Sequence, residues 1–187
     1  MKTGQSYGCA DYRNLIKFDE NGKGDITPLL QSGIIFGRII EGLSQPFFLD
    51  NFDKIAGIEA RGFVFAAAMA HRLGKGLVLV RKCGKIPFNT MQLKCFDYSG
   101  SEKCLEISRE AIHEGDKILV VDDWLETGSQ LKSTIAIIKE LGGVVSGIAM
   151  LINAATPEAQ KYIADFKYHF LINLPPTSTK KTTAGVV

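Results

Sequence analysis

The chain has 187 residues and a formal net charge of +2, which argue against a long multidomain protein and a strongly basic nucleic-acid-binding protein. Hydrophobic residues make up 45% of the sequence and charged residues 22%, as in one globular domain with a core. No apolar run could span a bilayer, and the N-terminus lacks the apolar stretch of a signal peptide, so we expect a cytoplasmic protein without a membrane or nucleic-acid partner.

The first 50 residues predict a small unit ahead of the main fold. They contain the turn DENGKGD at 19–25, followed by LLQSGIIFGRIIEGL at 29–43. The apolar spacing of the second stretch predicts an amphipathic helix, and Gly and Asn punctuate the first.

From residue 54 onward, short apolar strands alternate with helices. Strands are predicted at 54–58, 76–82, 115–122, 144–152 and 167–174, and helices at 62–74, 130–143 and 156–166. This alternation predicts an α/β fold with a mostly parallel sheet covered by helices on both faces. Ligands of such sheets bind beyond the carboxyl ends of the strands, so the loops that begin at Glu59, Arg81 and Asp122 are the candidates for a site.

Two segments lack a clear period. Residues 83–104 are rich in turn formers and predict a loop or ribbon that covers the binding edge, and the polar tail at 175–187 predicts disorder. We therefore expect a single domain over 1–174. The four cysteines, Cys9, Cys83, Cys95 and Cys104, form no C-x-x-C pair, so we expect reduced, partly buried thiols.

The stretch ILVVDDWLETGSQ carries the clearest chemistry. Asp122 and Asp123 follow a buried strand, where neighbouring carboxylates repel each other unless a diol or a divalent cation pairs with them. The backbone N–H groups of residues 127–130 begin a helix and form a cradle suited to phosphate. A ribose 5-phosphate satisfies both halves, whereas helix capping alone accounts for only one acid. A phosphoacceptor receiver domain would need a phosphorylated Asp and then a Lys on later strands, whereas only 64 residues follow Asp123 and they contain a single further Asp, Asp165.

These residues resemble the phosphoribosyl pyrophosphate (PRPP) signature of type I phosphoribosyltransferases. The block DKIAGIEARGFVFAAAMAHRLGKGLVLVRKCGKIP, at 53–87, is similar to adenine phosphoribosyltransferases, and the likeness extends over about residues 23–153. The resemblance implies the type I phosphoribosyltransferase fold: a mostly parallel twisted sheet, a small hood from about residues 1–50, and a flexible loop.

The resemblance also implies roles for individual residues. Asp122 and Asp123 would bind the ribose hydroxyls of PRPP, and the segment Glu126, Thr127, Gly128, Ser129 and Gln130 its 5-phosphate. Pyrophosphate would be bound by Glu59, Ala60, Arg61, Arg81, Lys82 and Lys85, with a cis peptide at Glu59-Ala60. Cations there would neutralise the charge that develops on leaving pyrophosphate. Mg²⁺ would be held mainly through PRPP, with no direct protein ligand expected.

The base pocket departs from the adenine pattern. The family carries an aromatic residue and an Arg before the run DITP, whereas Lys23 and Gly24 stand here. Trp124 and Leu125 are the candidate base-pocket residues, and the ring of Trp124 could stack on a purine. Glu126 stands where adenine enzymes have Ala, and Glu126 or Asp97 is the candidate catalytic proton carrier.

The resemblance therefore implies transfer of the phosphoribosyl group from PRPP to adenine, giving AMP and pyrophosphate. Two alternatives remain open at this point: a 6-oxopurine (xanthine, hypoxanthine or guanine) enzyme, favoured by Glu126, and a non-catalytic PRPP-binding regulator. The partners implied are PRPP and a purine base, and relatives are usually homodimers.

Overall fold

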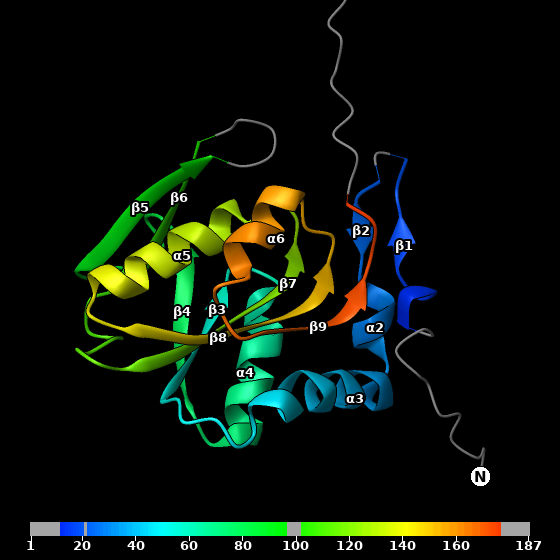
Figure 1. The fold of residues 1–187 in the computed structure, drawn as a ribbon, viewed down its shortest axis with the longest axis horizontal. Helices are drawn as coiled ribbons and strands as arrows, with labels where there is room; N and C mark the ends of the chain where they lie inside the picture. The colour runs from blue at the N-terminus through cyan, green and yellow to red at the C-terminus, as the bar shows by residue number, and fades with distance from the viewer. Residues whose placement is uncertain (1–11, 21, 97–101, 177–187) are drawn as a thin grey trace, which may run out of the picture.

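The computed structural model describes residues 12–20, 22–96 and 102–176 (Figure 1). Its centre is a seven-stranded sheet with the strand order β5-β6-β4-β3-β7-β8-β9. The five strands from β4 to β9 in this order are mutually parallel, and β5 and β6 add an antiparallel extension beside β4. The strands are β3 Lys54–Ile58, β4 Gly76–Lys82, β5 Thr90–Phe96, β6 Glu102–Ser108, β7 Lys117–Leu125, β8 Val144–Asn153 and β9 Tyr168–Asn173.

Helices cover the sheet on both faces, as predicted. Figure 1 shows α5 and α6 over one face, and α3 and α4 pack on the other. The helices are α2 Thr27–Gln31, α3 Gly33–Ser44, α4 Gly62–Leu73, α5 Ser129–Glu140 and α6 Pro157–Ile163, and the 3-10 helix η1 is Gln45–Phe47.

Strand β7 shows why both faces are apolar. Leu119 and Val121 point into the core beneath α3 and α4, whereas Ile118 and Val120 point into the core beneath α5 and α6. All four are fully buried, and each such side chain contributes roughly 1.5–3 kcal/mol of hydrophobic stabilisation. The strand is thereby held from both sides, which gives the acids at its end a rigid base.

The predicted helix over 29–43 is wrong in one respect, because the structure divides it into α2 and α3. Ser32 separates them with extended backbone angles and accepts a hydrogen bond from the N–H of Ile35 at 3.4 Å. A serine at this position caps the second helix instead of continuing the first. In α6 the cap is as the sequence predicts, with the Thr156 hydroxyl accepting from the N–H of Ala159.

The N-terminal region, predicted as a hood over about residues 1–50, contains a separate hairpin, and from here on the word hood means this hairpin alone. It pairs β1 Lys17–Phe18 with β2 Gly24–Asp25 in antiparallel register, and Phe18 lies opposite Gly24. The Asp25 carboxylate accepts hydrogen bonds from the N–H and the hydroxyl of Thr27, which connects the hood to the start of α2.

The segment 83–104 is a ribbon, formed largely by the β5–β6 hairpin, with residues 97–101 outside the described part. The prediction that all cysteines are reduced is wrong for Cys83 and Cys104, which form a disulfide. Strand pairing brings their Cα atoms to 5.3 Å, a proximity that 21 residues of sequence separation conceal. Cys9 and the predicted disordered residues from 177 onward lie outside the described residues.

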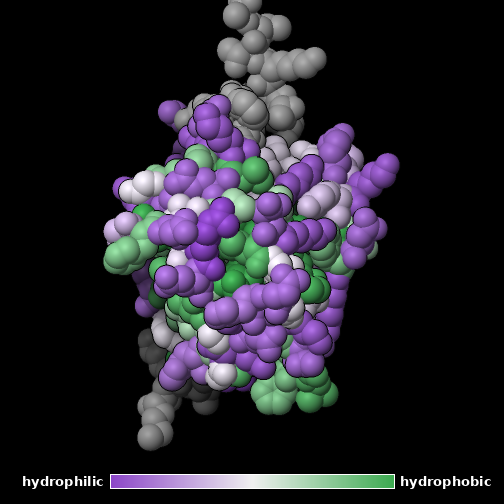
Figure 2. Space-filling model, turned by 90° about the vertical axis from the view of Figure 1, so that its left-hand side faces the viewer, coloured by the Kyte–Doolittle hydropathy of each residue, from purple (hydrophilic) through white to green (hydrophobic). Residues whose placement is uncertain are grey.

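The outer side of this ribbon is mainly polar. Figure 2 views the molecule from the left of Figure 1, and hydrophilic side chains cover most of that face, with hydrophobic ones showing between them.

Among the described helices, none is long and apolar enough to cross a membrane.

Candidate active site

Three neighbouring strands end at the same edge of the sheet and carry the residues singled out from the sequence. Strands β4, β3 and β7 lie side by side in parallel, so the loops that follow Ile58, Lys82 and Leu125 emerge together. The predicted phosphate, ribose and pyrophosphate residues are thereby gathered from segments up to about 70 residues apart in the chain.

The acid pair lies at the end of β7. Asp123 is buried, with its Oδ2 at 2.8 Å from the Nε of Arg61, while the Oδ1 of Asp122 accepts the N–H of Asp123 at 2.9 Å. Burial raises the pKa of Asp122 well above its usual range, and the charge of Asp123 raises it further. Burial also raises the pKa of Asp123, although Arg61 opposes this. Hydroxyl donors or cationic groups of a ligand would relieve this cost.

Arg61 connects the acid pair to the hood. Besides its ion pair with Asp123, its NH1 donates to the carbonyl of Gly24 at 3.2 Å. The next residue, Gly62, allows the start of α4 to approach β7, since a Cβ there would lie 2.7 Å from the Oδ1 of Asp122. The peptide bond between Glu59 and Ala60 is cis, as the resemblance implies.

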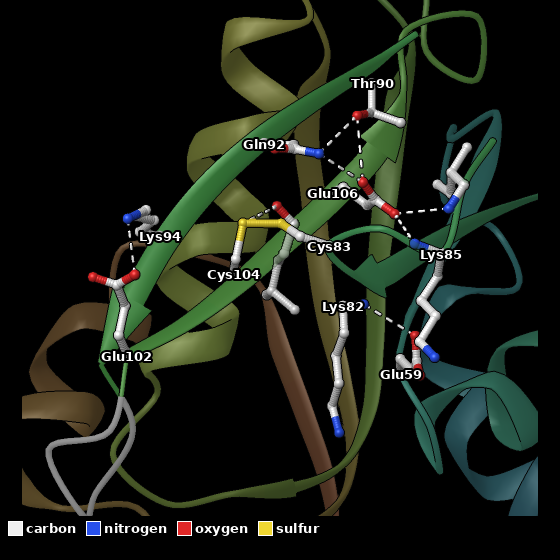
Figure 3. Close-up of a disulfide and its surroundings, with 12 residues drawn as sticks. Glu59, Lys82, Cys83, Lys85, Thr90, Gln92, Lys94, Glu102, Cys104 and Glu106 are labelled. Carbon is white, nitrogen blue, oxygen red and sulfur yellow. Dashed lines mark hydrogen bonds and ion pairs between the residues drawn. A yellow bond between two sulfur atoms is a disulfide. The ribbon is translucent and has the colours of Figure 1, made fainter. Parts of the chain in front are cut away.

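The side chain of Glu59 has a role that the sequence did not suggest. Its Oε2 accepts from the Nε of Arg81 at 3.3 Å. The same oxygen accepts from the N–H of Lys82 at 3.0 Å (Figure 3). The carboxylate therefore orients the cationic end of β4 instead of facing an anion. Arg81 in turn donates from NH1 to the carbonyl of Lys85 at 3.2 Å.

The predicted phosphate cradle is the start of α5. Gly128 precedes the helix with a φ of 72°, and the helix runs for 12 residues from Ser129. The Thr127 hydroxyl accepts from the N–H of Ser129 at 3.4 Å and so shapes the turn. First-turn N–H groups and the helix dipole make this end attractive to anions. The turn is held in place because the carbonyl of Glu126 accepts from the N–H of Thr156.

Two aromatic rings meet at the hood end of the site. Trp124 and Phe18 pack edge to face with their ring centroids 6.2 Å apart. A Cβ on Gly24 would overlap the ring of Trp124, so the ring occupies the space that a side chain at residue 24 would need. A cavity of about 400 Å³ lies beside them, and it is lined by Lys17, Phe18, Asp19, Lys23, Gly24, Asp25 and Arg61.

The remaining predicted residues divide into three groups. Leu125 is buried in the core beneath α5 and α6, away from Trp124, so the structure gives no support to its place in a base pocket. Glu126 is partly exposed beside the cradle, and Gln130 is exposed on the first turn of α5. Asp97 lies outside the described residues.

Phe18 is the main residue that the sequence reasoning missed. It is 51% exposed and lines the cavity, although position 23, where the family carries its aromatic residue, holds Lys. The turn signal at 19–25 contained the clue, since a hairpin across that turn places residue 18 beside residue 24.

The site at this edge of the sheet combines an anion cradle, two desolvated acids and a set of cations. This combination suits a sugar that carries phosphate groups at both ends. Combined with a parallel sheet, a hood and a ribbon, it defines the class of type I phosphoribosyltransferases.

Comparison with known proteins identifies the family. Residues 24–178 match the family described as phosphoribosyl transferase domain. An adenine phosphoribosyltransferase of Thermotoga sp. (strain RQ2) is 40% identical over 148 residues, covering 79% of this chain and 86% of the relative. Another, from Bifidobacterium adolescentis, is 35% identical over 153 residues, covering 81% of this chain and 79% of the relative. The crystal structure of adenine phosphoribosyltransferase from Thermoanaerobacter pseudethanolicus has a TM-score of 0.83 and 33% identity, covering 89% of this chain and 99% of that one. The chain therefore belongs to the phosphoribosyltransferase family, which confirms the prediction.

Proposed function

We propose that the protein transfers the 5-phosphoribosyl group of PRPP to adenine, giving AMP and pyrophosphate in purine salvage. The observation that carries this proposal is the arrangement at the sheet edge. The Asp122–Asp123 pair ends β7 just before the start of α5, and Arg81 and Lys82 end β4, the second strand along from β7 in the same sheet. This supports a 5-phosphate at the start of α5 and a pyrophosphate at the end of β4. Adenine is favoured over other purines because the relatives reported above are adenine enzymes.

The chain's own residues would act mainly by positioning and by stabilising charge. Bond breaking between the sugar and pyrophosphate leaves positive charge on the ribose and negative charge on the leaving group. Asp122 and Asp123 hold the ribose and face the positive charge, while Arg81, Lys82 and Lys85 face the negative charge. We assign the proton exchange with the base to Glu126, and Asp97 is the second candidate.

The base would bind at the hood, between the cavity that Phe18 lines and the end of β7. Phe18 supplies the exposed aromatic face, and Trp124 supports it from behind through their edge-to-face contact. The aromatic ring therefore comes from the opposite strand of the same hairpin, whereas the family carries its aromatic residue at position 23.

We also propose that Mg²⁺ enters with PRPP. Among the described residues, no group of three or more His, Cys, Asp or Glu side chains is placed to hold a metal ion. The acid pair and the open sheet edge fit an ion that keeps most of its coordination from phosphate oxygens and water. When bound, Mg²⁺ would neutralise charge on the leaving pyrophosphate.

We also propose that the protein is a homodimer that works in the cytoplasm. Exposed apolar side chains on α4 and β4, namely Val64, Leu77 and Leu79, support a partner surface there.

The test is to incubate the protein with PRPP and Mg²⁺ and to follow pyrophosphate release with each purine separately. We expect release with adenine and none with hypoxanthine, guanine or xanthine. Release with an oxopurine alone would instead assign the 6-oxopurine activity that Glu126 favours. Tight binding of PRPP without release in any of these mixtures would refute both enzymatic functions.

A further inference from the structure

The ribbon contains one buried carboxylate that the proposed reaction does not use. Glu106 of β6 is 1% exposed and lies between the buried core residues Leu105 and Ile107. A buried carboxylate is costly unless hydrogen-bond donors satisfy it. Glu106 has them: the N–H groups of Lys85 and Ile86 donate to its Oε1 at 2.7 and 2.8 Å.

A second set of donors comes from β5. The amide nitrogen of Gln92 donates to the Oε2 of Glu106 at 2.9 Å, and the hydroxyl of Thr90 lies at 3.4 Å (Figure 3). Burial acts to raise the pKa of Glu106, but the backbone donors at Ile86 and Lys85, the Gln92 side chain and the N–H of Gly84 outweigh it and lower the pKa below its usual value. The group is therefore ionised at neutral pH, and it binds its donors as a charged acceptor.

The turn that Glu106 holds is the one that carries the cations. Arg81 lies directly opposite Glu106 in the β4–β6 ladder, so their side chains leave the sheet on the same face. The peptide groups around Lys85 are held from two sides, because the N–H of Lys85 donates to Glu106 and its carbonyl accepts from Arg81. Arg81 then contacts Glu59, which completes a continuous path from the ribbon to the loop after β3.

The Cys83–Cys104 disulfide closes the same turn from its other end. Cys83 follows β4 directly, its N–H donates to the carbonyl of Cys104 at 3.0 Å, and Cys104 lies two residues before Glu106 on β6 (Figure 3). The backbone of residues 83–86 is thus attached to β6 at both ends. The side chains of Lys82 and Lys85 extend from this fixed backbone.

We propose that Glu106 is a positioning residue for the pyrophosphate group, which fixes the turn after β4 so that Arg81, Lys82 and Lys85 face that anion. This inference rests on the proposed function. Glu106 does not touch the substrate in this scheme. It acts through the backbone of Lys85 and Ile86, and a turn held in advance spares the ligand the cost of ordering it.

The test compares Glu106→Ala and Glu106→Gln with a matched control, Glu102→Ala. Glu102 lies on the same strand, but it is exposed and pairs with Lys94 at the surface. The dissociation constants of Mg²⁺-pyrophosphate and of AMP are measured by calorimetry, and the KM for PRPP is measured by pyrophosphate release. AMP carries the ribose 5-phosphate without a pyrophosphate, so it reports on the rest of the site.

For Glu106→Ala we expect pyrophosphate affinity and the KM for PRPP each to worsen by about tenfold, as for loss of one or two hydrogen bonds to a charged group. AMP affinity should stay within about twofold, which a general loss of structure would not allow. Glu106→Gln should fall between the wild type and Glu106→Ala, because its oxygen still accepts from the two N–H groups. Glu102→Ala should match the wild type.

Unchanged pyrophosphate affinity in a folded Glu106→Ala variant, or an equal loss for AMP, would overturn the inference. If Glu106→Ala does not fold, Glu106→Gln decides: weaker pyrophosphate binding with unchanged AMP binding supports the inference, and wild-type binding of both overturns it. Failure of the proposed function is distinguishable, since it shows as a wild-type protein that binds pyrophosphate but releases none from PRPP.

Discussion

The two carboxylates at the end of β7 lower the stability of the ligand-free protein. Because the pKa of Asp122 is raised on folding, the folded state bears a cost wherever the carboxyl is ionised in both states. That cost is largest at neutral pH and above, and it fades as the pH falls through the raised folded pKa towards the usual value of 3.8.

We predict that Asp122→Asn raises the melting temperature of the ligand-free protein at pH 7 by about 2–4 °C while lowering turnover by about tenfold or more. The asparagine oxygen can still accept the N–H of Asp123, so only the charge is removed. Differential scanning calorimetry between pH 4 and pH 8 measures the effect, and the gain should shrink towards pH 4.

Asp116→Asn is the control with the opposite sign. Hydrogen bonds from Lys54 and from the N–H of His113 lower the pKa of Asp116, so its stabilisation is present above 3.8 and is lost as the pH falls through the folded pKa. Its replacement should lower the melting temperature at pH 7. A fall in melting temperature for both variants would contradict the assignment of Asp122 as a destabilising group.

Trp124 offers a spectroscopic test of the hood, because it is the one tryptophan in the sequence. A Cβ at residue 24 would overlap its ring, so we predict that Gly24→Ala displaces the ring, shifts its fluorescence emission, and raises the KM for the base by about tenfold. The KM for PRPP should change little. In the Trp124→Leu background, which lacks the overlapping atoms, Gly24→Ala should leave the KM for the base unchanged from that of Trp124→Leu alone. A further tenfold rise in that background would show that Gly24 acts independently of Trp124.

At the residue scale, the sequence predicted the groups that depend on local order and missed those that depend on pairing. The acids at 122–123 and the turn at 127–130 follow from a strand that runs into a helix. Phe18 and the side chain of Glu59 acquire their contacts from segments distant in the chain, namely Trp124 and Arg81. Glu106 was hidden because the alternation in CLEIS assigns it to the solvent face, whereas the donors of the turn after β4 cover that face.

The elements of the sheet follow from hydrophobic pattern more fully than the elements of the hood and ribbon. Strands β3, β4, β7, β8 and β9 lie where continuous apolar runs predict them. Both faces are buried over most of β3, β7 and β8, whereas β4 and β9 are partly exposed. In contrast, β5 and β6 have one mainly polar face, and they are held in place by antiparallel pairing with each other, which a hydrophobic period does not reveal. The break between α2 and α3 also escaped, because apolar spacing continues through Ser32.

The disulfide gives the ribbon a tether whose effect can be measured. Cys83 and Cys104 enclose a loop of about 21 residues, for which the chain-entropy model gives about 3 kcal/mol of stabilisation. We predict that Cys83→Ser lowers the free energy of unfolding by roughly that amount in denaturant titrations without reductant.

Addition of a dithiol reductant should lower the stability of the wild type to that of Cys83→Ser and leave the variant itself unchanged. The wild type without reductant, unfolded and titrated with a thiol reagent, should give two fewer free thiols than the fully reduced protein. A count of four free thiols in the oxidised protein would contradict the bridge between β4 and β6.

At the scale of the whole molecule, the side chain of Arg61 joins the loop after β3, the acid pair of β7 and the hood. Arg61 directly precedes α4, forms an ion pair with Asp123 of β7, and donates to the carbonyl of Gly24 in the hood. The hood makes only short pairings of its own, since β1 and β2 have two residues each, so its position over the sheet edge depends on such contacts.

We predict that Arg61→Lys lowers kcat/KM by about tenfold or more, because a single ammonium group cannot reproduce the separate Nε and NH1 contacts of the guanidinium. The charge is retained, so a loss would reflect geometry more than electrostatics. Steady-state kinetics give the rate, and proteolysis at the hood hairpin reports whether residues 17–25 are released from the edge. Faster cleavage together with slower turnover is the expected result. Slower turnover with unchanged cleavage would place the role of Arg61 at the pyrophosphate alone, and unchanged turnover would remove it from the site.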